Sequence, residues 1–420
     1  MEKKVLLIFV MVLFLLSLLA LNHASAVEPV KIAINGEFTG RSATYGMGAL
    51  YAVRFEVKKK NEAGGIKSLG GAKIELIEVD NVSEPKDAVA SHERLGSNKE
   101  ILAILGPSVT PQAMAVEPVA GKYRIPTIFF TTTTDQIFEH GNKYVFSLST
   151  LATRIGETYA RFMLEMQKKH RVPLNRITLA YPDNEYGLNV SNSFKQIMKK
   201  AGLEKNIVLD QPFDSVSKDL SPIVLKLKAA NPDFHLQVGY FADGKLFHDA
   251  CFNMAFHPLQ VGGFSSFDHP DLWKALGEKV GAATIGNPKT FAADGFAFDL
   301  PNPSRDAWVK SFSAENPKAP IEYTLFQGAM ATKMLISALE IAGKRDREAI
   351  TDALHKIYLQ KDDPLDLMGV MEKPGYVWQS NGKLNSWSVI VQWQQKKGKW
   401  ETVTMYLPTY GMIGVSPSFK

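Results

Sequence analysis

The chain has 420 residues, with 48 basic and 43 acidic side chains spread evenly, and a net charge of +5. This charge is too mild for a nucleic-acid-binding protein, which gathers basic residues on one face. The single cysteine, Cys251, cannot form an internal disulfide, so we expect stability to come from packing rather than from covalent cross-links.

The first 26 residues have the order of a secretory signal peptide. A basic start is followed by an apolar run over residues 5–21 and by the small-x-small pattern Ala24-Ser25-Ala26. The alternative is a transmembrane anchor, but the run is near the lower limit of about 17–25 residues needed to span a bilayer. We therefore expect cleavage after Ala26 and a periplasmic location for the remaining chain.

Strands and helices alternate from the start of the mature chain. Strands are predicted at 30–35, 73–79, 101–105 and 126–130, with helices between them at 44–62, 85–95 and 111–123. This alternation predicts a parallel sheet covered by helices. Right-handed crossovers place the loops that follow the strands along one edge of the sheet, where ligands bind.

The same alternation begins again after Thr150. Strands are predicted at 177–181, 206–209, 234–238 and 259–262, and helices at 152–168, 186–201, 218–230 and 243–255. Further helices are expected at 304–313, 323–342 and 345–358, before an antiparallel pair of strands at 386–393 and 400–405. Two such runs in one chain predict two similar sheets, each with its own core.

Motifs for catalysis and metal binding are missing from the sequence. It has no Gly-x4-Gly-Lys-Ser/Thr phosphate loop, no His-Glu-x-x-His pair and no Gly-x-Ser-x-Gly elbow. The nine histidines are scattered, and none has metal-ligand spacing. We expect no cofactor, no metal and no enzymatic activity. An exported hydrolase is the alternative, because catalytic sites are defined by geometry rather than by sequence order.

Several short segments carry a resemblance to a known family. They are the glycine-rich loop 36–46 and the stretches 61–66, 80–88, 105–110, 125–128 and 183–187. In this order they resemble the branched-chain amino acid type of periplasmic solute-binding protein, which serves ABC importers, over nearly the whole mature chain. The resemblance implies an α/β, two-lobed type I periplasmic-binding-protein fold. Each lobe is then a mostly parallel sheet flanked by helices, and the ligand cleft lies between the lobes.

The resemblance also implies that the chain crosses between the lobes three times. We expect an N-terminal lobe of residues 27–149 and 286–369 and a C-terminal lobe of residues 150–285 and 370–420, after the signal peptide 1–26. Rotation of the lobes about these crossings is expected to bury the ligand.

The resemblance implies that hydroxyl and backbone N–H groups of the first lobe hold a ligand carboxylate. Thr110 and Thr133 match the two hydroxyl positions, and Thr131 matches a position that contributes a backbone contact. Pro111 favours a helix start after Thr110, and a helix N-terminus suits an anion. Alternatively, Thr110 is an ordinary helix N-cap, and the threonine run 131–134 bonds to the local backbone.

Three tyrosines match positions that line the cleft from both lobes. They are Tyr45, Tyr186 and Tyr240, and Tyr323 is a further candidate for an apolar wall. Tyrosine offers an apolar face with a polar tip, which suits an amphipathic solute. The alternative for each is packing in the core.

One position departs from the family. Amino-acid-binding members place an acidic residue after the strand that ends near Gly262, where it pairs with the ligand ammonium, and Ser265 occupies that place here. A desolvated ammonium without a carboxylate is costly. Either Asp268 supplies the charge, or the ligand has no ammonium.

The expected ligand is therefore a small carboxylate: an aromatic or other organic acid, or a branched-chain or other amino acid. Four phenylalanines either frame a bulky group of this ligand or belong to the core, which is the commoner place for Phe. They are Phe129, Phe130, Phe264 and Phe267. The expected partner is an inner-membrane ABC permease with its ATPase, and no nucleic acid. A ligand-sensing receptor subunit with the same cleft is the alternative function.

Overall fold

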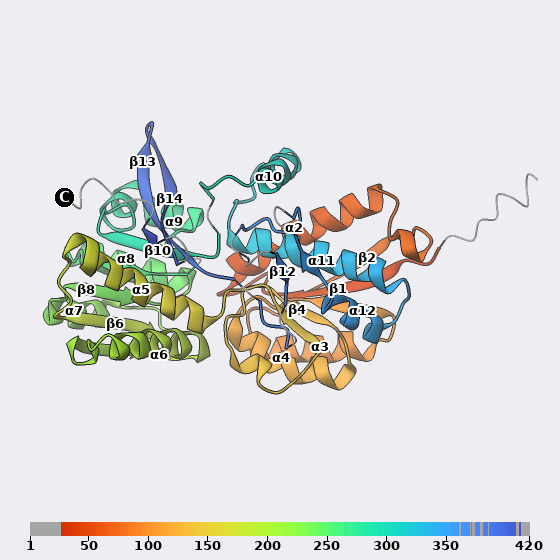
Figure 1. Cartoon of the computed structure of the whole chain (residues 1–420), viewed down its shortest axis with the longest axis horizontal. Coiled ribbons are helices and arrows are strands. Elements are labelled where there is room, and N and C mark those ends of the chain that lie inside the picture. The colour runs from red at the N-terminus through yellow and green to blue at the C-terminus, as the bar shows by residue number, and fades with distance from the viewer. Residues whose placement is uncertain are drawn as a thin grey trace, which may run out of the picture.

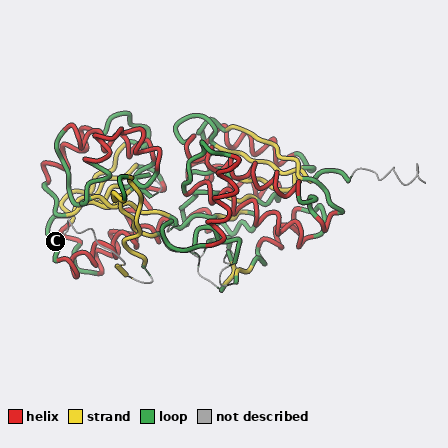
Figure 2. The backbone as a smooth tube through the Cα atoms, turned by 90° about the horizontal axis from the view of Figure 1, so that it is seen from above, coloured by secondary structure: helices red, strands yellow, loops and turns green. Residues whose placement is uncertain are grey.

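The computed structural model describes residues 27–420 apart from 265, 297, 361–362, 370, 372–373, 379–380, 385, 409–410 and 413–420. The predicted signal peptide lies outside the described residues. Two lobes, each a sheet flanked by helices, lie side by side along the long axis of the molecule (Figures 1 and 2). This arrangement confirms the predicted α/β fold with two mainly parallel sheets.

The first lobe is built on a parallel sheet in the order β2-β1-β3-β4-β5. Its strands are β1 (Val30–Gly36), β2 (Ile74–Asp80), β3 (Ile101–Leu105), β4 (Thr127–Phe129) and β5 (Val145–Ser147). Helix α2 (Ala43–Glu62) packs on α11 (Tyr323–Ala342) above the sheet in Figure 1, and α3 (Pro85–Ser97) packs on α4 (Thr110–Tyr123) below it. Strand β3 is buried throughout, because helices cover both faces of this sheet.

The second lobe is built on a sheet in the order β15-β14-β13-β10-β9-β8-β6-β7. The strands are β6 (Ile177–Pro182), β7 (Ile207–Phe213), β8 (Phe234–Gln237), β9 (Gln260–Gly262), β10 (Thr290–Asp294), β13 (Val389–Lys396), β14 (Lys399–Leu407) and β15 (Gly411–Met412). Its helices are α5 (Ala152–His170), α6 (Glu185–Lys200), α7 (Ser221–Ala230), α8 (Phe241–Asn253) and α9 (Pro270–Ala283). The strands from β6 to β10 are parallel to their neighbours, and β13 begins the antiparallel part.

The second crossing between the lobes differs from the prediction. Strand β10 pairs in parallel with β9 and antiparallel with β13, so residues up to Asp294 belong to the second lobe rather than to the first. Strand β10 stays in the second lobe because it is hydrogen-bonded on both sides there, to β9 in the parallel part of the sheet and to β13 in the antiparallel part. After it, α10 (Pro303–Glu315) packs on α2 through the ring of Trp308, which contacts Phe55 at 5.7 Å between centroids.

The third crossing also falls later than predicted. Strands β11 (Tyr358–Leu359) and β12 (Gly375–Tyr376) form a small antiparallel pair after α12 (Arg347–Leu354). Beyond them, the indole N–H of Trp378 donates a hydrogen bond of 2.7 Å to the carbonyl of Ser147 in β5. The chain therefore stays on the first lobe past residue 370 and enters the second lobe just before β13. The hydroxyls of Thr150 and Ser386, 2.9 Å apart, join the first and third crossings.

Most of the predicted strands and helices are confirmed within a few residues, but β5, β10 and α9 were missed. The N-terminus of α9 is capped by His269, whose Nδ1 accepts a hydrogen bond of 3.1 Å from the backbone N–H of Asp271. Gly277 has φ +74° and interrupts the helix, which obscures the helical spacing in the sequence. Within the described residues, no helix has the length and apolar character required to cross a membrane.

Candidate ligand cleft

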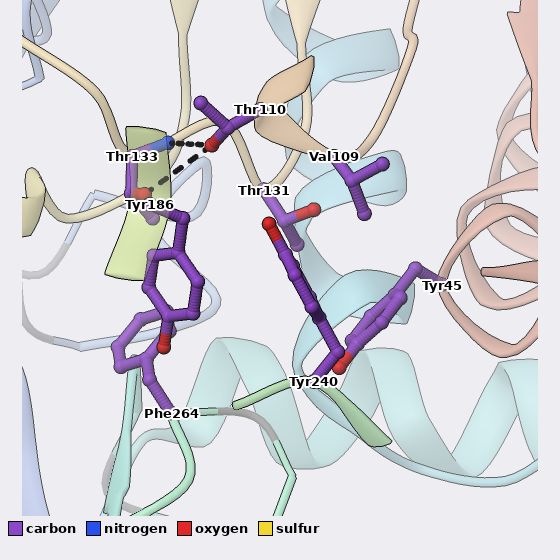
Figure 3. A pocket seen from close by; sticks show the side chains of 8 residues that line it. All are labelled: Tyr45, Val109, Thr110, Thr131, Thr133, Tyr186, Tyr240 and Phe264. Carbon is purple, nitrogen blue, oxygen red and sulfur yellow. Dashed lines mark hydrogen bonds between the residues drawn. The ribbon is translucent and has the colours of Figure 1, made fainter. Parts of the chain in front are cut away.

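A small cavity, here called the cleft, lies between the lobes at the carboxyl ends of their strands (Figure 3). It is lined by Tyr45, Val109, Thr110, Thr131, Thr133, Tyr186, Tyr240 and Phe264. Six of these are candidates that the sequence singled out as ligand-binding: the three threonines and the three tyrosines. The structure thus brings together side chains from both lobes that are up to 219 residues apart (Tyr45 to Phe264).

The threonines of the first lobe converge at one end of the cleft. Thr110 Oγ1 lies 3.4 Å from Thr133 Oγ1 and accepts a hydrogen bond of 3.3 Å from the backbone N–H of Thr133. Thr131 Oγ1 donates a hydrogen bond of 2.6 Å to the carbonyl of Ser108. The N-cap of α4 is Val109, so the interpretation of Thr110 as an N-cap is wrong: Thr110 is the first residue of the helix.

A buried carboxyl group supports the loop that carries Thr110. Glu37 is fully buried, and its two oxygens accept hydrogen bonds from the backbone N–H groups of Ser108 at 3.0 and 3.1 Å and of Val109 at 3.3 Å. Burial raises the pKa of Glu37, and the hydrogen bonds from these N–H groups oppose the rise. The sequence did not single out Glu37 within its glycine-rich segment.

The tyrosines close the cleft from both lobes. The hydroxyl of Tyr45 accepts a hydrogen bond of 2.8 Å from the backbone N–H of Phe241 in the opposite lobe. The ring centroids of Tyr186 and Tyr240 are 5.1 Å apart, and those of Tyr45 and Tyr240 are 6.4 Å apart. Burial raises the pKa of all three tyrosines, so each is a neutral hydrogen-bonding group at physiological pH.

The cleft is closed in this structure. The free space inside it is about 20 Å³, which is enough for a single water molecule. A larger ligand therefore requires the lobes to move apart, which separates Tyr45 of the first lobe from Tyr240 of the second.

Two polar contacts join the lobes beside the cleft. The Arg41 guanidinium, 29% exposed, forms an ion pair with the Asp243 carboxylate, which is 1% exposed. Asp243 also accepts a hydrogen bond of 2.9 Å from the backbone N–H of Tyr240 and so caps α8. Burial raises the pKa of Asp243 to about 6, although Arg41 opposes the rise. In addition, Asn189 Nδ2 donates a hydrogen bond of 2.9 Å to Thr134 Oγ1.

Two candidates remain, Ser265 and Asp268. Ser265 lies outside the described residues, and its position stays a prediction. Asp268 lines a second hollow, in which Asp294 lies beside it and Phe296 and Trp393 form part of the wall. Asp268 is held there because β10 brings Asp294 next to it, and the two carboxyl groups are hydrogen-bonded to each other. In the described part of the chain, no group of three or more His, Cys, Asp or Glu side chains is placed to hold a metal ion.

The four phenylalanines divide between the cleft and the core. Phe264 lines the cleft, whereas Phe129, Phe130 and Phe267 are 1% exposed or less and belong to the core. Tyr323 stands behind Phe264, edge to face, with 5.2 Å between ring centroids. Tyr323 is therefore a support for the wall of the cleft.

The chain belongs to the periplasmic binding protein family, whose model matches residues 29–399. It is thus a solute-binding protein and not an enzyme. Among curated proteins, it is similar to Leu/Ile/Val-binding protein homolog 7 of Brucella abortus, with 27% identity over 94% of this chain and 96% of the relative. The leucine-specific-binding protein of Salmonella typhimurium is 26% identical over 76% and 82%.

Two solved structures have the same fold. One is the branched-chain amino acid transporter substrate-binding protein of Streptococcus pneumoniae in complex with isoleucine, with 20% identity, a TM-score of 0.73 and coverage of 90% of this chain and 100% of that one. The other is an ABC transporter solute-binding protein of Rhodopseudomonas palustris in complex with 3,4-dihydroxybenzoic acid, with 18% identity, a TM-score of 0.73 and coverage of 90% and 96%.

Proposed function

We propose that this chain is the extracytoplasmic solute-binding protein of an ABC importer and that it captures a small carboxylate in the cleft. The observation that carries the proposal is the position of Thr110 and Thr133. Their hydroxyls converge at the N-terminus of α4, where unpaired N–H groups and the positive end of the helix dipole favour an anion.

Hydrogen bonds within the first lobe order the carboxylate site. Glu37 fixes the backbone of Ser108 and Val109, and the hydroxyl of Thr131 is bonded to the carbonyl of Ser108. A site that is already ordered loses little conformational entropy when it binds, so more of the interaction energy appears as affinity. This rigidity supports a role in capturing a solute at low concentration.

Capture is completed by closure of the lobes. Contacts that join the lobes in the closed state include the Arg41–Asp243 pair, the Phe241–Tyr45 hydrogen bond and the Asn189–Thr134 hydrogen bond. A ligand shifts the equilibrium toward closure only by the contacts that it makes better in the closed state. Here those contacts are the ones that it makes with the tyrosines of the second lobe while its carboxylate stays on the first.

The partner in this proposal is an inner-membrane ABC permease with its ATPase, which receives the closed, loaded form. Export through a cleaved signal peptide at residues 1–26 places the protein in the periplasm. The two solved relatives support the ligand class, because isoleucine and 3,4-dihydroxybenzoic acid are both carboxylic acids.

The first experiment is a thermal-shift screen of the mature protein against amino acids, aliphatic acids and aromatic acids. A compound that binds the native state raises the melting temperature. Chromatography of each hit after incubation with the protein is expected to recover the compound unchanged. A new product would favour a hydrolase instead.

The second experiment tests the threonines. Replacing both Thr110 and Thr133 by valine keeps the shape and removes the hydroxyls. A hydrogen bond to a charged group contributes about 1.5–3 kcal/mol, so loss of one such bond weakens binding by about 10- to 100-fold and loss of both by more. The matched control is the T110S/T133S variant, which keeps the hydroxyls. Undiminished affinity of the valine variant in isothermal titration calorimetry would contradict the proposal.

A further inference from the structure

The described lining of the cleft carries no charged side chain. None of its eight residues is Asp, Glu, Lys, Arg or His, and burial raises the pKa of its three tyrosines, which are therefore neutral. A ligand ammonium buried here would meet no carboxylate among these eight residues.

Asp243 and Asp268 are already engaged in other contacts. Asp243 pairs with Arg41 and accepts the backbone N–H of Tyr240. Asp268 is hydrogen-bonded to Asp294 and lines the second hollow. Burial, and then the neighbouring Asp268, raise the pKa of Asp294 well above its ordinary range. Recruiting either acid to an ammonium would break an existing pair.

The hydroxyl of Tyr186 is the polar group that the cleft leaves without a partner. Tyr186 is 3% exposed, and its Oη has no hydrogen-bond partner among the described residues. In Figure 3 this hydroxyl points away from the threonines, toward Phe264. A buried hydroxyl without a partner is unfavourable, and a polar group on a bound ligand removes that cost. The hydroxyl therefore indicates a second polar group on the ligand, at the end opposite its carboxylate.

The walls of the cleft are aromatic on both lobes. The rings of Tyr45, Tyr186, Tyr240 and Phe264 surround the space between the two polar ends. Aromatic rings pack well against one another edge to face or offset. A flat aromatic ring between the carboxylate and the distal polar group fits this lining.

On the basis of the function proposed above, we propose that the cleft selects an aromatic carboxylate that has no α-ammonium group and carries a hydroxyl at its far end, where Tyr186 recognises it. The threonines recognise the carboxylate, the aromatic rings hold the body of the ligand, and Tyr186 discriminates hydroxylated from unsubstituted acids.

The test compares matched pairs of ligands by calorimetry on the mature protein. Tyrosine is paired with 3-(4-hydroxyphenyl)propanoate, which differs from it only by the amine, and 4-hydroxybenzoate is paired with benzoate. We expect the acid without the amine to bind at least about 10-fold more tightly than tyrosine, and 4-hydroxybenzoate about 10-fold more tightly than benzoate, the size expected for one buried hydrogen bond.

Two variants assign these preferences to residues. Y186F is expected to reduce the preference for the hydroxylated acid to less than about 3-fold, because the phenylalanine keeps the ring but has no hydroxyl. D268N, the control outside the cleft, is expected to leave the ranking of the ligands unchanged. Tighter binding of tyrosine than of its deaminated partner, or loss of amino-acid binding in D268N, would overturn the inference.

The outcome for this inference is separable from that for the proposed function. If amino acids bind best and the valine variant of Thr110 and Thr133 loses them, the carboxylate site stands and only the ligand class proposed here is wrong. If no acid of either kind binds, the proposed function fails as well.

Discussion

Replacement of Arg41 by glutamine tests whether the Arg41–Asp243 pair stabilises the closed state. The pair joins the two lobes, and the carboxylate is 1% exposed whereas the guanidinium is 29% exposed. A hydrogen bond to a charged group contributes about 1.5–3 kcal/mol. Partial exposure of the guanidinium places this pair in the lower part of that range, about 1.5–2 kcal/mol. Because ligand binding includes closure, R41Q is expected to weaken ligand binding by about 10- to 30-fold.

The same variant has a pH signature. Without Arg41, closure buries an unpaired Asp243, whose pKa is already raised to about 6 by burial. Closure then takes up a proton, so the affinity of R41Q is expected to increase as the pH falls from 8 to 6. Isothermal titration calorimetry at pH 6, 7 and 8 measures both effects. The matched control is R54Q, because Arg54 pairs with Glu78 inside the first lobe. Equal affinities for R41Q and R54Q at every pH would refute the reasoning.

Two further predictions concern stability. Burial raises the pKa of Asp294 well above its ordinary range, and the folded state then holds a proton that the unfolded chain releases, so this group lowers stability as the pH rises. We expect D294N to raise the melting temperature more at pH 8 than at pH 5, and equal shifts would contradict this. In α2, a Cβ at position 46 would lie 2.1 Å from the carbonyl oxygen of Glu37. We expect G46A to lower the free energy of unfolding by about 1–3 kcal/mol, as measured by urea denaturation. An unchanged free energy of unfolding would contradict this and would show that the backbone at Glu37 moves aside for the methyl group.

The cleft was more predictable from the sequence than the boundaries of the lobes. Thr110, Thr133 and Tyr186 lie in or beside short segments whose order and spacing resemble a family. Thr110 begins α4, Thr133 lies in the loop after β4, and Tyr186 is in the first turn of α6. The loops after parallel strands meet at one edge, so these residues converge once the fold is known. The local sequence around these three residues was therefore sufficient to predict that they line the cleft.

The position of Asp268 depends on a contact that local sequence does not contain. Its carboxyl is held by Asp294, which is 26 residues away and is brought alongside by β10. Strand β10 was not predicted because it is short, from Thr290 to Asp294, and because two of its five residues are alanine, which is uncommon in strands. Missing this strand therefore displaced both the lobe boundary and the predicted contact of Asp268.

The contact between the Tyr45 and Tyr240 rings has a consequence for release of the solute. These rings belong to different lobes and both line the cleft, so they separate when the lobes move apart. A solute enclosed between the lobes therefore leaves only after this aromatic contact and the Arg41–Asp243 pair are lost together. The free energy of that opening has to come from whatever docks on the closed form, and it limits how firmly a deliverable solute can be held.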